Sequence, residues 1–167
     1  MKTLIVLRHG KAGPYARDIA GDKARALTER GERDAEAMGK LIGMLVKPDL
    51  VVSSDAVRAR QTAEIAAEAF GYNGKIALEP AIYQADLDDL LDIVRNLPAS
   101  ADVVVIAGHN PGFSELSWAL APEGTPPVDL PTAAFAHFQF STSKWRDVRP
   151  GTGDLCGIHS PKDKKGS

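Results

Sequence analysis

The sequence predicts an α/β domain with a mainly parallel central sheet. Short runs of apolar and β-branched residues alternate with longer segments of helical periodicity, and this alternation is typical of strands joined by helical crossovers. Two of the runs, at residues 4–7 and 103–107, are apolar throughout, as expected for strands that are buried on both faces of a sheet. The length of 167 residues suits one compact domain or at most two small ones.

The other elements are expected between and after these two strands. A polar loop punctuated by Gly and Pro should follow the first strand over residues 10–27. Helices are expected, in chain order, from residue 28, at 56–70, at 87–97 behind the cap Asp86, and at 113–120. The remaining strands are expected at residues 50–53, 75–78 and 133–140, the last of them pairing with residues 144–148. A loop with four prolines is expected at residues 121–131.

Composition and charge exclude several classes of function. The chain has 20 basic and 22 acidic residues and a formal net charge of −2, which argues against a dedicated binder of nucleic acid or of anionic membranes. Its single cysteine, Cys156, excludes an internal disulfide framework and a four-thiolate metal site. The apolar runs are too short to cross a bilayer, and the N-terminus lacks the pattern of a secretory signal peptide, so we expect a cytoplasmic protein.

Basic side chains stand at or just beyond the ends of three predicted strands. Arg8 and His9 follow the first strand, Arg58 lies in the first turn of the helix after the second, and His109 follows the fourth. Ligands of open parallel sheets bind outside the carboxyl ends of the strands. We therefore expect these two histidines and two arginines to converge on one edge of the sheet.

This set of side chains suits phosphoryl transfer. Catalysis of that reaction depends mainly on positioning and on stabilising the charge of the phosphoryl oxygens, and arginine offers paired donors that match those oxygens. A neutral imidazole is a competent nucleophile near neutral pH, and neighbouring guanidinium groups favour its neutral form. We expect no metal here, because the arginines would repel a dication and no carboxylate cluster accompanies the histidines.

Three motifs resemble those of the histidine phosphatase superfamily, which also contains the cofactor-dependent phosphoglycerate mutases. They are Leu-Arg-His-Gly at residues 7–10, the serine-led stretch with its Arg-Ala pair at residues 53–62, and Gly-His-Asn-Pro at residues 108–111. The order and separation of the motifs fit the family, and together they span residues 1–120.

Two weaker matches point to the SixA-like branch of that superfamily, the phosphohistidine phosphatases. Residues 25–31 and 131–134 are similar to segments of this branch, although Ala26 stands where the branch has proline. The resemblance implies a phosphoglycerate mutase-like fold, which is a three-layer α/β/α sandwich. It also implies a single histidine phosphatase domain at residues 1–159, and we expect a polar, flexible tail at residues 160–167.

The resemblance implies roles for individual residues as well. His9 would be the nucleophile and would be phosphorylated transiently. Arg8, Arg58 and His109 would bind the phosphoryl oxygens and stabilise the transition state, and Gly10 would leave room for the phosphoryl group against the backbone. No cofactor and no metal is implied. Loop hydrogen bonds, with either a structural or a functional role, are expected from two neighbours, Ser54 and Asn110.

One departure from the family bears on the substrate. Larger members carry a glutamate as general acid after the third strand, but here no glutamate stands near Ala85, Glu79 comes too early, and Asp86 is expected to cap a helix. Asp18 and Asp22 on the first loop remain candidates for a substitute acid. An imidazole leaving group needs less protonation than an alkoxide, so the gap favours phosphohistidine over a sugar phosphate.

The sequence leaves several functions open. The main hypothesis is an enzyme that removes phosphate from phosphohistidine on a signalling protein. The expected partner of the enzyme is then the phosphohistidine-carrying domain of that protein. The alternatives are a phosphatase of small phosphate esters and a non-catalytic phosphate-binding interaction domain. A mutase fits less well, because the short chain predicts a shallow, open pocket. The basic residues of the first loop either dock a partner or solvate the loop: Lys11, Arg17, Lys23 and Arg25.

Overall fold

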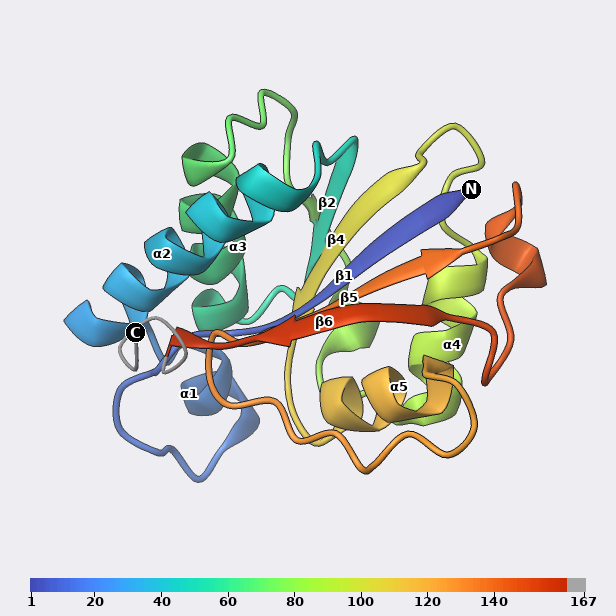
Figure 1. Cartoon of the computed structure of the whole chain (residues 1–167). Helices are drawn as coiled ribbons and strands as arrows, with labels where there is room; N and C mark the ends of the chain where they lie inside the picture. Colours follow the sequence, from blue (N-terminus) through green and yellow to red (C-terminus); the bar gives the residue numbers. More distant parts are fainter. Residues whose placement is uncertain (162–167) are drawn as a thin grey trace.

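Within residues 1–161, which this computed structural model describes, six strands form a sheet with the order β3-β2-β4-β1-β5-β6. Helices α2 and α3 lie against one face of the sheet, and α4 and α5 lie against the other (Figure 1). The three-layer α/β/α architecture expected from the sequence is confirmed.

The element boundaries follow the periodicity of the sequence closely. The strands are β1 (Lys2–Arg8), β2 (Leu50–Ser53), β3 (Ala77–Leu78), β4 (Val103–Gly108), β5 (Phe135–Phe140) and β6 (Asp154–His159). The α-helices are α1 (Ile19–Lys23), α2 (Glu29–Leu45), α3 (Val57–Ala69), α4 (Leu87–Arg95) and α5 (Gly112–Leu120). Short 3₁₀ helices are present at η1 (Pro80–Ile82) and η2 (Trp145–Asp147).

The part of the sheet that carries the site is parallel. Strand β4 pairs in parallel with both β1 and β2, and β2 pairs in parallel with the short edge strand β3. Strand β5 pairs antiparallel with β1 and with β6. Because β1, β4 and β2 are neighbours that run in the same direction, their carboxyl ends lie side by side at one edge of the sheet.

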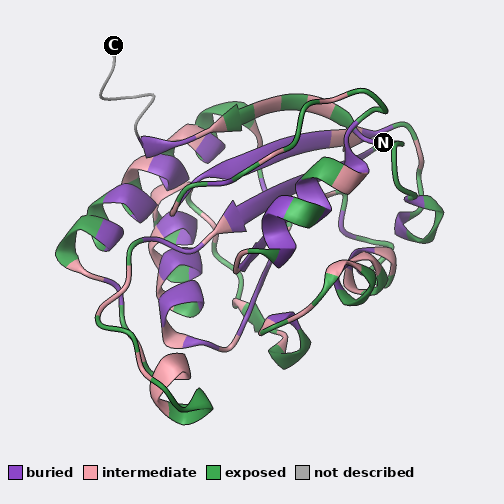
Figure 2. Ribbon diagram, turned by 90° about the horizontal axis from the view of Figure 1, so that it is seen from below, coloured by how far each residue is buried: buried purple, intermediate pink, exposed green. Residues whose placement is uncertain are grey.

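The two apolar runs form the centre of the core, as predicted. Along β1, Leu4 and Val6 pack with residues of α4 and α5, whereas Ile5 and Leu7 pack with residues of α2 and α3. Figure 2 shows the central strands buried between the two helical layers. Each fully buried aliphatic side chain of this kind contributes about 1.5–3 kcal/mol, so burial on both faces holds β1 firmly in register.

The C-terminal pairing predicted from the sequence is wrong. Residues 144–148 form η2 and its flanks rather than a strand, and β6 is the strand that pairs with β5. The reason is Trp145, whose buried indole donates a hydrogen bond to the carbonyl oxygen of Ala101 at 2.7 Å and so anchors the segment near the start of β4. Strand β6 was missed because its pattern of half-buried residues around Gly157 carries little hydrophobic signal.

The predicted first loop contains one helix of its own. Within residues 10–27, α1 begins after Asp18, whose side chain accepts a hydrogen bond from the Gly21 amide at 3.0 Å. All five residues of α1 are half-buried or exposed. The helix therefore has no apolar face that would predict it from the sequence. Asp22, on α1, lines the cavity beside His109.

The predicted tail begins at Ser160, which is itself buried, and its residues 162–167 lie outside the described part of the chain. Across the described part, no helix has the length and apolar character needed to span a membrane.

Candidate active site

The four residues predicted to converge do lie together. Arg8 ends β1 and His9 follows it, Arg58 stands in the first turn of α3 after β2, and His109 follows β4. The ring centroids of His9 and His109 are 5.3 Å apart. Both arginines lie close enough to lower the pKa of both histidines. The neighbouring carboxyl ends of three parallel strands thus bring the four side chains to one place.

His9 is held as a neutral imidazole with a defined tautomer. Its Nδ1 atom lies 2.6 Å from the carbonyl oxygen of Gly10, and since a carbonyl only accepts, Nδ1 carries the proton. Burial, together with the positive charges of Arg58 and Arg8, lowers the pKa of His9 to about 4, against the raising effect of the Gly10 hydrogen bond. The Nε2 atom therefore keeps its lone pair at neutral pH.

His109 is also neutral and is oriented by Ser54. The Nε2 atom of His109 lies 2.8 Å from the Ser54 hydroxyl, which also accepts a hydrogen bond from the Ala56 amide at 3.2 Å. Burial lowers the pKa of His109 to about 3, with smaller contributions from His9 and Arg58. Within residues 1–161 the buried Nδ1 atom of His109 has no hydrogen-bond partner.

The loop after α5 holds Arg8. The Nη1 atom of Arg8 donates to the carbonyl oxygen of Leu130 at 2.8 Å, and the Asn110 amide donates to the same oxygen at 2.9 Å. Asn110 also accepts hydrogen bonds from the backbone and the hydroxyl of Ser114. The Nε atom of Arg8 is buried without a partner in the described chain. The loop hydrogen bonds predicted for Ser54 and Asn110 are confirmed, and both reach the site.

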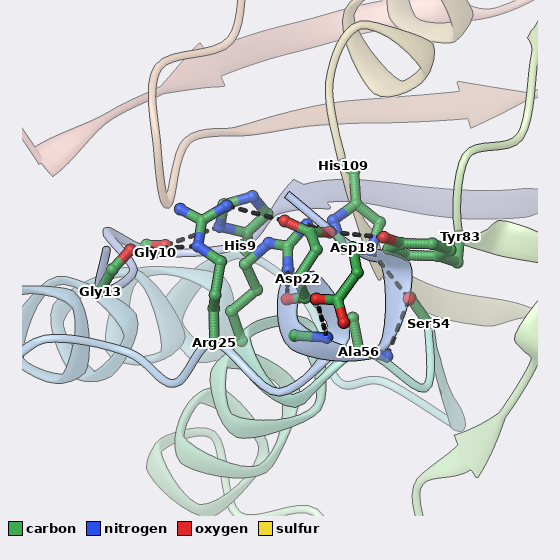
Figure 3. Close-up of polar contacts among 12 residues, drawn as sticks. His9, Gly10, Gly13, Asp18, Asp22, Arg25, Ser54, Ala56, Tyr83 and His109 are labelled. Atoms are coloured by element: carbon green, nitrogen blue, oxygen red, sulfur yellow. Dashed lines mark hydrogen bonds and ion pairs between the residues drawn. The ribbon is translucent and has the colours of Figure 1, made fainter. Parts of the chain in front are cut away.

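Asp22 of α1 binds Arg58 through two hydrogen bonds. Figure 3 shows Asp22 with its other partners, Arg25 and Tyr83. The Nη1 atom of Arg58 donates to the backbone oxygen of Asp22 at 2.8 Å, and Nη2 donates to its Oδ2 atom at 3.1 Å. Arg25 donates to Oδ1 of Asp22 at 2.9 Å, and the hydroxyl of Tyr83 donates to Oδ2 at 2.5 Å. Burial of Asp22 raises the pKa of its carboxyl group. The hydrogen bonds from Tyr83, Arg25 and Arg58 outweigh this effect and lower the pKa to about 2.

Tyr83 was not predicted as a site residue. It lies just after η1, its ring meets that of His109 edge-on at 5.5 Å, and the Lys23 ammonium stands over it at 5.0 Å. Tyr83 lies in the segment before Asp86 in which a general acid is expected, and its position there is the sequence signal that points to it.

The basic residues of the first loop divide into two groups. Lys23 pairs with Asp55 at 2.9 Å, and Arg25 pairs with Asp22 and donates to the Gly13 carbonyl oxygen at 3.1 Å. These two side chains are therefore committed to contacts within the chain. The others point to solvent: Lys11 and Arg17.

Gly10 packs closely against helix α2. A Cβ atom on Gly10 would lie 2.8 Å from the carbonyl oxygen of Gly31 in α2, so the glycine is needed for packing against that helix. The Gly10 amide also donates to the Thr62 hydroxyl at 3.0 Å. Gly10 thus fixes the backbone beside His9 between α2 and α3.

Residues 80–86, which end beside the site, contain no glutamate. Ala85 lines a cavity of about 430 Å³ beside His109, together with Asp22, Arg58, Tyr83 and other residues. Glu79 instead accepts from the Ala81 amide at the start of η1 and does not line this cavity. The carboxylates that do line it are Asp22, Asp86 and Glu115.

Two of the candidate acids are used as helix caps. Asp86 forms the predicted cap of α4 and shares a capping box with Asp89. Asp18 caps α1 and is exposed. Among residues 1–161, no three or more His, Cys, Asp or Glu side chains are grouped so as to hold a metal ion.

The fold is that of a known class of proteins. The family model of the histidine phosphatase superfamily (branch 1) matches residues 4–93, and the chain belongs to that superfamily. Within it the chain is SixA-like. A candidate phosphohistidine phosphatase SixA from Nakamurella multipartitia is 29% identical, covers 96% of each chain and superposes with a TM-score of 0.79. Its counterpart from Agrobacterium tumefaciens is 26% identical over 96% of this chain and 98% of that one, with a TM-score of 0.78.

A third relative is a candidate phosphoglycerate mutase, GpmB, from Erwinia tasmaniensis. It is 35% identical over 88 residues, which are 52% of this chain and 40% of that protein. The present chain thus matches less than half the length of this mutase relative, and the match supports the family rather than the activity.

Proposed function

We propose that this protein is a phosphatase that works through a phosphohistidine intermediate on His9 and that removes phosphate from phosphohistidine on a signalling protein. The observation that carries the proposal is the state of His9. Its imidazole is neutral, its Nδ1 proton is bound to the Gly10 carbonyl oxygen, and two guanidinium groups stand beside it. These are the conditions for nucleophilic attack on a phosphoryl group by Nε2.

The reaction would proceed in two steps. The lone pair of His9 Nε2 attacks phosphorus, the bond from phosphorus to the leaving group breaks, and its electron pair goes to the leaving group. Water then attacks the phosphorus on His9, the P–N bond to His9 breaks, and inorganic phosphate leaves. His9 returns to its neutral form, so the cycle consumes one water molecule and no cofactor.

Three neighbours have donors suited to the charge of the transferring group. Arg58 lies at the cavity, and Arg8 and His109 each have a buried nitrogen without a partner in the described chain. A buried donor without an acceptor is costly, and a phosphoryl oxygen would satisfy it. Because Ser54 can donate its proton to Nε2 of His109, Nδ1 of that ring can serve as the donor.

The choice of phosphohistidine rests on the leaving group. Ala85 stands in the cavity where a general acid is expected, so an alkoxide would leave without a proton from that position. An imidazole leaves more readily. The SixA relatives described above are named as phosphohistidine phosphatases, which supports the same choice.

We also propose that catalysis is independent of metal ions. The cations that magnesium supplies in other phosphoryl-transfer sites are here the guanidinium groups of Arg8 and Arg58. Their charges would also disfavour a dication next to the histidines.

The test is a comparison of turnover on a phosphohistidine peptide, p-nitrophenyl phosphate and a sugar phosphate. We expect the peptide to be cleaved fastest, the activated aryl ester more slowly and the alkyl ester slowest. Equal or greater turnover of the sugar phosphate would favour a phosphatase of small esters. Binding of phosphate without turnover of any substrate would favour a non-catalytic phosphate-binding domain.

A further inference from the structure

Asp22 is the point at which three segments meet beside the histidines. Its carboxylate accepts from Arg25 on its own loop, from Arg58 on α3 and from Tyr83 after η1. The side chain remains 20% exposed and lines the cavity that also contains His109. A carboxylate can accept about four hydrogen bonds, and these side chains supply three of them, so one acceptor position remains.

The surroundings of Asp22 keep its carboxylate ionised. Two guanidinium groups and a phenol hydroxyl donate to it, and the pKa of Asp22 falls to about 2. Around the same cavity the other ionisable groups are neutral His109 and two acids: Asp86 and Glu115. Ionised Asp22 has no proton to donate at neutral pH, which argues against its being the substitute acid considered from the sequence.

We propose that Asp22 accepts a hydrogen bond from the leaving imidazole of phosphohistidine, through the ring nitrogen that is not bonded to phosphorus. This inference rests on the proposed function. A phosphohistidine ring that carries a proton on that nitrogen is positively charged, and the carboxylate favours this form. When the P–N bond breaks, its electron pair returns to the ring, and the leaving group departs as neutral imidazole.

This contact removes the need for a proton from the protein. The proton required by the leaving group is already on its far nitrogen, and Asp22 holds it there. A phosphate monoester has no such N–H group, so it gains only a nearby negative charge from Asp22. Asp22 would therefore select phosphohistidine over esters.

The pH dependence of kcat provides the test, because kcat reports groups that titrate in the enzyme–substrate complex. A carboxylate raises the pKa of the bound phosphohistidine ring, so the wild-type enzyme should keep its kcat to higher pH than Asp22→Asn. In the Asn variant the alkaline limb of the kcat profile should move to lower pH. Turnover of the phosphohistidine peptide at alkaline pH should fall about ten- to a hundredfold, the value of one charged hydrogen bond.

Matched variants and a second substrate separate this role from others. Asp18→Asn changes an exposed aspartate of the same helix and should leave the profile in place. Asp22→Glu retains the charge, so its alkaline limb should stay near the wild-type position even if its rate falls. With p-nitrophenyl phosphate, Asp22→Asn should produce no shift of the alkaline limb.

Three results would overturn the inference. An equal loss on both substrates without a shift of the limb would show that Asp22 only positions Arg58. A loss that grows as the ester leaving group becomes poorer would show that Asp22 is a general acid. Failure of the wild-type enzyme to cleave the phosphohistidine peptide, while it cleaves the aryl ester, would instead refute the proposed function, and the inference with it.

Discussion

The Nε2 atom of His109 lies 2.8 Å from the hydroxyl of Ser54, although 55 residues separate the two in sequence. Ser54 follows β2 and His109 follows β4, so the contact exists because these strands are parallel neighbours. The Ser54 hydroxyl also accepts a hydrogen bond from the Ala56 amide. This leaves the hydroxyl proton of Ser54 free to point toward the imidazole of His109. The serine thereby sets which nitrogen of His109 can donate to a ligand.

Ser54→Ala should lower kcat by about tenfold, because His109 loses the partner that sets its tautomer. The matched control is Ser53→Ala, because the Ser53 hydroxyl donates to the Ser54 carbonyl oxygen and forms no hydrogen bond with His109. Steady-state turnover of p-nitrophenyl phosphate gives kcat for both variants. Equal losses in the two variants would show that local packing, not the contact with His109, matters.

His9→Ala should abolish turnover, because the nucleophilic lone pair is lost. Wild-type enzyme mixed with ³²P-labelled substrate and quenched without acid should carry the label on His9, as found by mass spectrometry of its peptides. Tungstate binding to the variant serves as the control for an intact fold. Retention of more than a few per cent of activity would contradict a covalent route through His9.

The activity should persist well into the acid range. Since burial and the neighbouring arginines lower the pKa of His9 to about 4, the ring stays neutral as the pH falls through 6.5. Protonation removes the lone pair only near pH 4, so kcat/KM on p-nitrophenyl phosphate, which reports groups that titrate in the free enzyme, should decline there. A decline centred on pH 6.5 would mean that His9 titrates as an ordinary, unperturbed histidine.

Gly31→Ala should destabilise the protein by about 1–3 kcal/mol, as expected for overpacking. A Cβ atom at this position would lie 2.2 Å from the carbonyl oxygen of Lys11, so the backbone after His9 must shift. Gly13→Ala is the control, because its Cβ would meet no heavy atom closer than 3.6 Å. Urea denaturation gives both free energies of unfolding, and similar values for the two variants would refute this account.

Treatment with EDTA should leave turnover unchanged, since the guanidinium groups supply the positive charge at the site. Vanadate or tungstate should inhibit by occupying the place of the transferring phosphoryl group. The comparison is made before and after chelation and again after adding Mg²⁺. Loss of activity in EDTA that a divalent ion restores would show that a metal is required.

The sequence by itself determined the parts of this protein that depend on local patterns. The apolar runs of β1 and β4 predicted their burial, because only a strand covered on both faces has no polar side. The positions of Arg8, His9, Arg58 and His109 next to strand ends predicted that they would meet, since parallel strands present their carboxyl ends at one edge.

Only the tertiary structure decided what depends on distant contacts. The indole of Trp145 donates a hydrogen bond to Ala101, 44 residues away in the sequence. The segment with this contact forms η2 instead of the predicted strand. Asp22 and Tyr83 are 61 residues apart, on elements with no apolar pattern that would bring them together. Their hydrogen bond forms because α1 and the segment after η1 reach the same side of the site, and side-chain chemistry between separate loops leaves no periodicity in the sequence.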